Sequence, residues 1–278
     1  MVAVNAHPDD EAILMGGTLA RLSAEGHRVV LVTATDGGAG VGESSLGARR
    51  LEELHVSATA LGVEDVIDLG YGDSGMGPRD LPTHGTRQRL HTVPVQEAGL
   101  RVAEILAHRA ADLVIGYDRA GGYGHRDHVQ IHHIVRTAAR ISDTRIIEAT
   151  APREPILRAL RVLERLRLLG DFESSEWAGA FTPKAHITHS VDVRSHLDAK
   201  RAALSAHASQ TQTEDRSLAR VLALPRPVFT RLLGREFFIE PGRMRPSPRS
   251  TACLADLVGS AGTAQPDLPV HARPEDPR

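Results

Sequence analysis

The first 150 residues alternate between short runs rich in β-branched residues and longer segments whose apolar residues recur with helical spacing. Consecutive parallel strands need such long return connections, so the alternation predicts a parallel sheet with right-handed crossovers. One run, RVVLVTAT at Arg28–Thr35, is strongly apolar, as expected for a strand covered on both faces. We therefore expect an α/β, Rossmann-like fold, with a mostly parallel sheet and helices on both faces.

The bounds of the expected elements follow from periodicity and from the turn residues between the runs. Strands are expected at Val2–Ala6, Arg28–Thr35, Val63–Leu69, Ala111–Tyr117 and Thr144–Ala149, and helices at Glu11–Glu25, Ala48–Leu61, Leu100–His108 and His125–Arg140. The second half is less regular and predicts a smaller, irregular C-terminal subdomain. It holds expected helices at Ile156–Leu169 and Ser195–His207, and expected strands at Ala185–Val193 and, as a last edge strand, at Phe237–Ile239.

Composition divides the chain into a folded domain and a tail. We expect one domain over residues 1–241, with the Rossmann-like core at about 1–150. After Pro241 the sequence is rich in Pro, Ser, Gly and Arg, which predicts a mostly disordered tail over 242–278 with a short helix near Cys253–Val258.

Charge and cysteine content exclude several classes of function. The net charge of -2 gives no electrostatic reason to expect a nucleic-acid or anionic membrane partner. No apolar run is long enough to span a bilayer, and the N-terminus has no secretory leader, so we expect a cytoplasmic protein. A single cysteine excludes a thiolate zinc cluster, which leaves the 15 histidines as the supply of metal ligands. Whether the chain forms a homo-oligomer is left open.

Two polar clusters follow expected strands, at Ala6–Glu11 and Gly121–His128. Ligands of open α/β sheets bind at such carboxyl ends. Each cluster alone has a plainer explanation. Proline and acidic residues are typical of a helix N-terminus, and His125 and His128 would share one solvated helix face. That explanation does not account for His7 at a strand end, nor for two adjacent carboxylates.

Taken together, the clusters predict a metal centre. His7, Asp10 and His128 form a set of two histidines and one carboxylate, which suits Zn²⁺ with an open position for water. The same set could hold Fe²⁺. Asp9 is then left beside the metal, in the position of a general base. Asp127 lies beside His125 in sequence and could orient it or keep it protonated.

These motifs resemble those of a known family. His-Pro-Asp-Asp-Glu after the first strand, followed later by Gly-His-Arg-Asp-His, is similar to the LmbE/PIG-L family of zinc-dependent N-deacetylases, and the resemblance runs over roughly Val2–Val193. Four stretches further resemble the mycothiol-pathway branch of that family: Leu46–Val63, YGDSGM at Tyr71–Met76, GGYGHRDH at Gly121–His128 and KRAALSAHASQ at Lys200–Gln210.

The resemblance implies a role for each site residue. His7, Asp10 and His128 would bind the metal, and Asp9 would take a proton from the attacking water and return it to the departing amine. His125, steadied by Asp127, would stabilise the oxyanion as an imidazolium or donate the proton, and Tyr123 would add a hydroxyl donor.

Arg50 and Asp73 would hydrogen-bond hydroxyl groups of the sugar. From the residues alone, Arg50 is equally a surface helix charge, and Asp73 is typical of a structural turn. His207 lies on an amphipathic helix, where a packing or surface role is the plainer interpretation.

The predicted function is therefore metal-dependent hydrolysis of an N-acyl group, taken to be acetyl, on an amino sugar or its glycoside. The partner implied is a small-molecule amino-sugar substrate. Two alternatives stay open: an amidase acting on a larger conjugate or antibiotic intermediate, and a non-catalytic protein that binds metal or sugar.

Overall fold

A mixed sheet forms the centre of the molecule. The computed structural model describes residues 1–38, 46–76, 87–167, 173–212 and 217–242. Within them the strand order is β3-β2-β1-β4-β5-β7-β6. The parallel strands are β1 (Val2–Asn5), β2 (Val30–Thr35), β3 (Asp65–Tyr71), β4 (Leu113–Tyr117) and β5 (Arg145–Thr150). β7 (Arg235–Ile239) runs antiparallel to β5 and to β6 (His189–Asp192). The predicted α/β fold with a mostly parallel sheet is confirmed.

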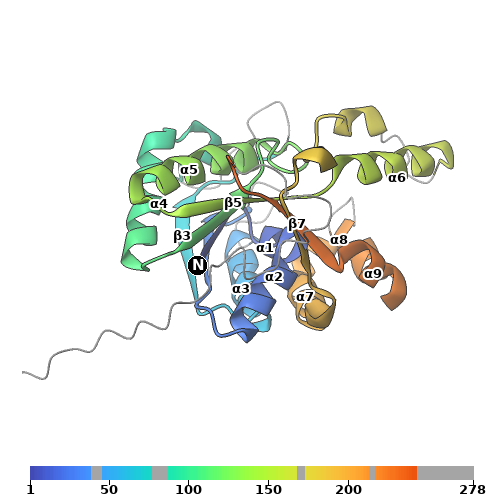
Figure 1. The fold of residues 1–278 in the computed structure, drawn as a ribbon, viewed down its shortest axis with the longest axis horizontal. Helices are drawn as coiled ribbons and strands as arrows, with labels where there is room; N and C mark the ends of the chain where they lie inside the picture. The colour runs from blue at the N-terminus through green and yellow to red at the C-terminus, as the bar shows by residue number, and fades with distance from the viewer. Residues whose placement is uncertain (39–45, 77–86, 168–172, 213–216, 243–278) are drawn as a thin grey trace, which may run out of the picture.

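Helices cover both faces of the sheet (Figure 1). One apolar cluster joins the sheet to α1 (Asp10–Leu14), α2 (Gly16–Ala24), α3 (Leu46–Ala60) and α7 (Leu197–Ala206). The other joins it to α4 (Val95–His108) and α5 (Arg126–Ser142). The remaining helices are α6 (Arg153–Arg165), α8 (Ser217–Leu222) and α9 (Arg226–Leu233), with short 3₁₀ turns at Leu90–Thr92, Ser174–Trp177, Lys184–His186, Arg194–His196 and Ala208–Gln212.

Two of the differences between the expected and the observed elements have a tertiary cause. The predicted edge strand at Phe237–Ile239 is not at the edge: β7 pairs on both sides, and β6 is the outer strand. The predicted helix Glu11–Glu25 is broken at Met15. The break has a physical cause, because the carboxylate of Glu236 accepts hydrogen bonds from the backbone of Gly17 and Thr18 and so caps a new helix start.

The stretch Leu100–His108, expected to belong to a helix, is part of α4, which begins at Val95 directly after Pro94; proline suits the position before a helix because it lacks the backbone N–H that a helix interior needs. The expected tail at 242–278 lies outside the described residues apart from Gly242, and so does the short helix expected near Cys253–Val258.

Candidate metal centre and active site

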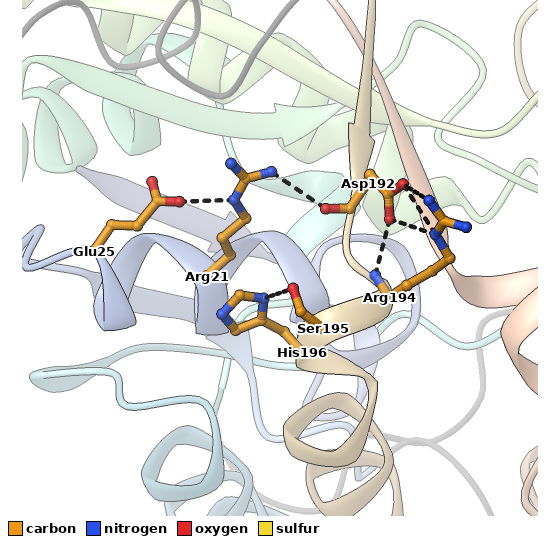
Figure 2. A pocket seen from close by; sticks show the side chains of 6 residues that line it. All are labelled: Arg21, Glu25, Asp192, Arg194, Ser195 and His196. Carbon is orange, nitrogen blue, oxygen red and sulfur yellow. Dashed lines mark hydrogen bonds and ion pairs between the residues drawn. The ribbon is translucent and has the colours of Figure 1, made fainter.

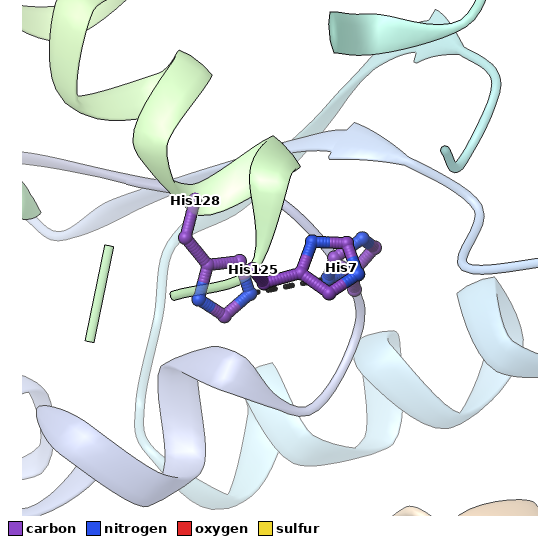
Figure 3. A group of neighbouring side chains, drawn as sticks. All are labelled: His7, His125 and His128. Atoms are coloured by element: carbon purple, nitrogen blue, oxygen red, sulfur yellow. Dashed lines mark hydrogen bonds between the residues drawn. The ribbon is translucent and has the colours of Figure 1, made fainter. Parts of the chain in front are cut away.

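Three predicted ligand atoms converge at the carboxyl edge of the sheet. Nδ1 of His7 lies 3.3 Å from Oδ2 of Asp10, and Nε2 of His128 lies 3.3 Å from each of these two atoms. Figure 3 shows the rings of His7, His125 and His128 gathered together, with a dashed line between His7 and His128. In a tetrahedron with metal–ligand bonds of about 2.0–2.1 Å, ligand atoms lie about 3.3–3.4 Å apart. The spacing therefore fits a tetrahedral metal ion.

The outer nitrogens of both imidazoles face acceptors. Nδ1 of His128 lies 3.2 Å from the carbonyl oxygen of Gly121, and Nε2 of His7 lies 3.2 Å from Asp127 and 3.3 Å from Asp73. Each outer nitrogen can thus donate its proton outward, which leaves the inner nitrogen as a lone-pair donor. Such outer contacts orient the histidine ligands of metal sites.

The charges around the three atoms favour a cation. Burial alone would raise the pKa of Asp10 and of Asp73, but His128 lowers the first and His7 lowers the second, so both carboxyls stay ionised. Asp127 is completely buried, and its pKa is lowered against burial by the hydrogen bond to His7. One ligand atom each of His7, Asp73, His125 and Asp127 also lies within 4.8 Å of the others.

Asp9 occupies a turn between β1 and α1 with an unusual backbone. Its φ of 115° lies in the region that favours glycine. The Oδ2 atom of Asp9 lies 3.2 Å from the Arg50 guanidinium, and the peptide N–H donates to Glu11 over 2.9 Å. Burial raises the pKa of Asp9 to about 6. The charge of Arg50 opposes this rise, and the charge of Asp10 adds to it. A carboxylate of that pKa can accept and return a proton near neutral pH.

His125 lies beside the ligand rings, and Asp127 contacts it through its backbone rather than through its carboxylate. The Asp127 carboxylate accepts hydrogen bonds from His7 and from the Ser74 backbone. It is the backbone N–H of Asp127 that donates to Nδ1 of His125, over 3.1 Å. Nδ1 is then an acceptor, so the ring is neutral with its proton on Nε2. Burial, with His7 and His128, lowers the His125 pKa to about 4, which favours a neutral donor over the imidazolium.

Arg50 and Asp73 both lie at the site, where each holds another residue. Arg50, on α3, donates to the carbonyl oxygens of Pro8 and Gly37 over 2.6 and 2.5 Å. Asp73 follows β3, faces His7 and accepts from the Gly75 backbone over 2.9 Å. The surface-charge interpretation of Arg50 is wrong, because its side chain is only 9% exposed.

Tyr123 is more exposed than the other predicted site residues. Its ring is edge-on to His128 at 5.0 Å and stacks on Trp177 at 5.9 Å, and the residue is 38% exposed. Burial raises its pKa, so the hydroxyl keeps its proton. Trp177 has no role in the sequence prediction, because nothing in the sequence except its residue type marks it.

Two buried residues at the site, Tyr117 and Asp118, have no role in the sequence prediction. Tyr117 ends β4, stacks flat on His128 at 4.2 Å and accepts a hydrogen bond from the Ala6 backbone. Asp118 accepts hydrogen bonds from the Gly122 backbone and from the Thr182 hydroxyl. It therefore connects the loop before α5 with the C-terminal half. Their position at the end of a strand is the signal that could have revealed both.

A surface hollow lies away from the candidate metal centre. It measures about 700 Å³ and is lined by Arg21, Glu25, Asp192, Arg194, Ser195 and His196 (Figure 2). None of these residues is a predicted site residue, and the two arginines already pair with carboxylates.

Within the described residues, no helix has both the length and the apolar character needed to cross a membrane.

Comparison with known proteins identifies the family. Residues 2–139 match the PIG-L family, described as GlcNAc-PI de-N-acetylase. A 1D-myo-inositol 2-acetamido-2-deoxy-alpha-D-glucopyranoside deacetylase from Nocardiopsis dassonvillei is 34% identical over 78% of this chain and 86% of its own length. The deacetylase of the same name from Corynebacterium diphtheriae is 36% identical over 79% of each chain. An N,N'-diacetylchitobiose deacetylase structure from Pyrococcus horikoshii covers 89% of this chain and 86% of its own, with a TM-score of 0.54 and 22% identity, and shows the shared fold. This chain therefore belongs to the PIG-L family of de-N-acetylases.

Proposed function

We propose that the protein is a zinc-dependent hydrolase that removes the acetyl group from the nitrogen of an amino-sugar glycoside. The observation that carries the proposal is the convergence of His7, Asp10 and His128 to mutual distances of 3.3 Å. Two nitrogens and one carboxylate oxygen at this spacing suit Zn²⁺, and Fe²⁺ could take the same place. Asp9 and His125, beside the ligands, supply the groups that an amide hydrolysis needs.

His7, Asp10 and His128 would hold the metal, which when bound polarises the amide carbonyl and lowers the pKa of water. Asp9 then accepts a proton from the water whose oxygen attacks the amide carbon. His125, neutral with its proton on Nε2, donates a hydrogen bond to the developing oxyanion. When the carbon–nitrogen bond breaks, Asp9 passes its proton to the leaving nitrogen, and the products are a free amine and acetic acid, which loses its remaining proton to solvent to give acetate.

The substrate class rests on the relatives and on the groups around the metal centre. The relatives with 34 and 36% identity are named as deacetylases of an inositol 2-acetamido-2-deoxy-glucopyranoside. We assign Arg50 and Asp73 to the sugar hydroxyls and Tyr123 to the oxyanion or the sugar face. Tyr123 and Trp177 form an aromatic wall of the kind that packs against a sugar ring.

The test measures amine release by metal-stripped protein reloaded with Zn²⁺ or Fe²⁺. Substrates are N-acetylglucosamine, its α-inositol glycoside and a bulky amide conjugate. We expect metal-dependent turnover of the glycoside, and a loss in kcat of about 10²–10⁴-fold in Asp9→Asn. Asparagine tolerates the positive φ of Asp9, so the turn is kept.

Asp143→Asn is the matched control, because Asp143 also has a positive φ next to a helix end but lies at the far end of α5. Full activity in the metal-free protein or in Asp9→Asn would contradict the proposal. Cleavage of the bulky conjugate alone would replace the deacetylase by an amidase.

A further inference from the structure

The turn that carries Asp9 is held by a buried carboxylate. A residue other than glycine in the left-handed region costs of order 1–3 kcal/mol, so its surroundings must hold it there. Oε2 of Glu11 accepts the Asp9 N–H over 2.9 Å, and Glu11 is completely buried. The same turn is held from the other side by Arg50, which donates to Pro8 and Asp9.

The other oxygen of Glu11 is engaged from two further elements. Oε1 accepts from the Ser57 hydroxyl over 2.5 Å and lies 2.6 Å from Nε2 of His207. Ser57 lies on α3, and His207 follows α7. We call Glu11, Ser57 and His207 the Glu11 clamp. It joins three elements that are far apart in the sequence.

His207 has a single polar contact that explains its place in the protein interior. The residue is completely buried, and its Nδ1 has no hydrogen-bond partner among the described residues. Its Nε2 therefore makes the contact that offsets the cost of burying the ring, and this contact is with Glu11. A histidine buried only for packing would not need to end on the carboxylate that holds Asp9.

We infer that Glu11, held in place by Ser57 and His207, is a positioning residue that fixes the carboxylate of Asp9 for proton transfer. The inference rests on the proposed function, in which Asp9 is the general base. It assigns part of the site to the C-terminal half, since His207 lies outside residues 2–139 that match the family. Within the described part of the chain, the side chain of Glu11 hydrogen-bonds to Asp9, Ser57 and His207 and not to the three ligand side chains.

The test is a double-mutant cycle between Glu11→Ala and Asp9→Asn, read as kcat, KM and bound metal. Misplacing a catalytic group by about 1 Å can cost about 10²-fold. We expect Glu11→Ala to lower kcat by about that factor, with KM and bound metal nearly unchanged. In the Asp9→Asn background Glu11→Ala should have little further effect, because the group that it positions is already absent.

His207 gives a second, milder variant in case Glu11→Ala does not fold. His207→Ala should lower kcat on the order of tenfold, the effect of losing one charge-assisted hydrogen bond. His207→Gln should restore most of it, since its amide can donate to Glu11.

Glu53→Ala is the matched control, because Glu53 is also buried on α3 and tethers the C-terminal segment through Ser209, without contacting Asp9. Its kcat per folded molecule should stay at the wild-type value. The inference would be overturned, with the proposed function left intact, if Glu11→Ala and His207→Ala were as active as the wild type while Asp9→Asn was inactive. Additive losses in the cycle would do the same. An inactive wild-type protein, or an active Asp9→Asn, would overturn the proposed function and the inference with it.

Discussion

Two buried acid–base pairs lie between the C-terminal half and the first two helices, and their carboxylates bind different backbone groups. His207 meets Glu11 over 2.6 Å, and Lys200 meets Glu236 over 2.6 Å; all four residues are at most 3% exposed. Both basic partners come from α7 or its end. By burial and distance alone the two pairs cannot be told apart.

The difference lies in what each carboxylate holds besides its basic partner. Glu236 accepts from the backbone of Gly17 and Thr18, which separates α2 from α1, while Glu11 accepts from the backbone of Asp9. One pair therefore fixes a helix start and the other a proposed catalytic turn. A buried ion pair is by itself weak evidence for either stability or function, so the third partner decides the interpretation.

The largest effect is expected from Glu236→Ala. The change leaves the Lys200 ammonium buried without its carboxylate and exposes two backbone N–H groups to an apolar environment. Breaking such a pair costs about 3–5 kcal/mol of the free energy of unfolding. Urea denaturation measures the loss, and kcat per folded molecule should be unchanged. A loss of kcat at unchanged stability would show that both pairs serve the active site.

A smaller loss is expected from Lys200→Met. The Glu236 carboxylate keeps its two backbone donors, so only the pairing and the hydrogen bond from Lys200 to the Ile13 carbonyl are lost. We expect a decrease of about 1–3 kcal/mol in the free energy of unfolding. Lys184→Met, at an exposed position, provides the control for removing a lysine charge. A decrease as large as that of Glu236→Ala would mean that the backbone donors contribute nothing.

The same distinction explains which features the sequence could predict. The sheet and the two clusters were accessible because their signals are local: β-branched runs, turn residues, and polar residues at strand ends. Glu11 lies within the first cluster, yet its sequence position indicates only a helix N-terminus. Its partner His207 is 196 positions away, and no local pattern links the two.

Errors in the sequence interpretation have the same origin. The edge assignment of Phe237–Ile239 failed because pairing with both β5 and β6 is set by tertiary contacts. The break at Met15 depends on Glu236, which no helical pattern in the first helix reveals. Asp127 was expected to orient His125 or keep it protonated; its backbone N–H does donate to His125, but side chains two apart at a helix start point in different directions. The carboxylate reaches His7 instead.

A pH-dependent loss of stability should separate the two pairs further. Burial alone would lower the pKa of His207, but the charge and the hydrogen bond of Glu11 raise it above its ordinary value. The charge of Asp9 also raises this pKa, and the charge of Arg50 lowers it. A raised folded-state pKa stabilises the protein below the unfolded value of about 6.5, and this stabilisation is lost as pH rises through the folded value. The difference in unfolding free energy between wild type and His207→Gln should therefore shrink above pH 6.5, by at most about 1.4 kcal/mol per pH unit. A difference that is constant with pH would contradict a charged pair.

The smallest effect on stability and activity is expected at an ion pair that has several hydrogen bonds but is exposed to solvent. In the hollow of Figure 2, Arg194 donates to Asp192 through Nε and Nη2, and these hydrogen bonds lower the Asp192 pKa to about 2. The side chains are 62% and 36% exposed, so water and salt screen the pair and both groups remain solvated when it is broken. Arg194→Ala should leave the urea midpoint at 0.15 M salt and the deacetylase kcat at their wild-type values. A measurable loss of either would show that the number of hydrogen bonds in an ion pair, rather than its burial, determines its contribution to stability or activity. The burial of the Glu11 clamp would then be no reason to expect a larger effect there than at an exposed pair.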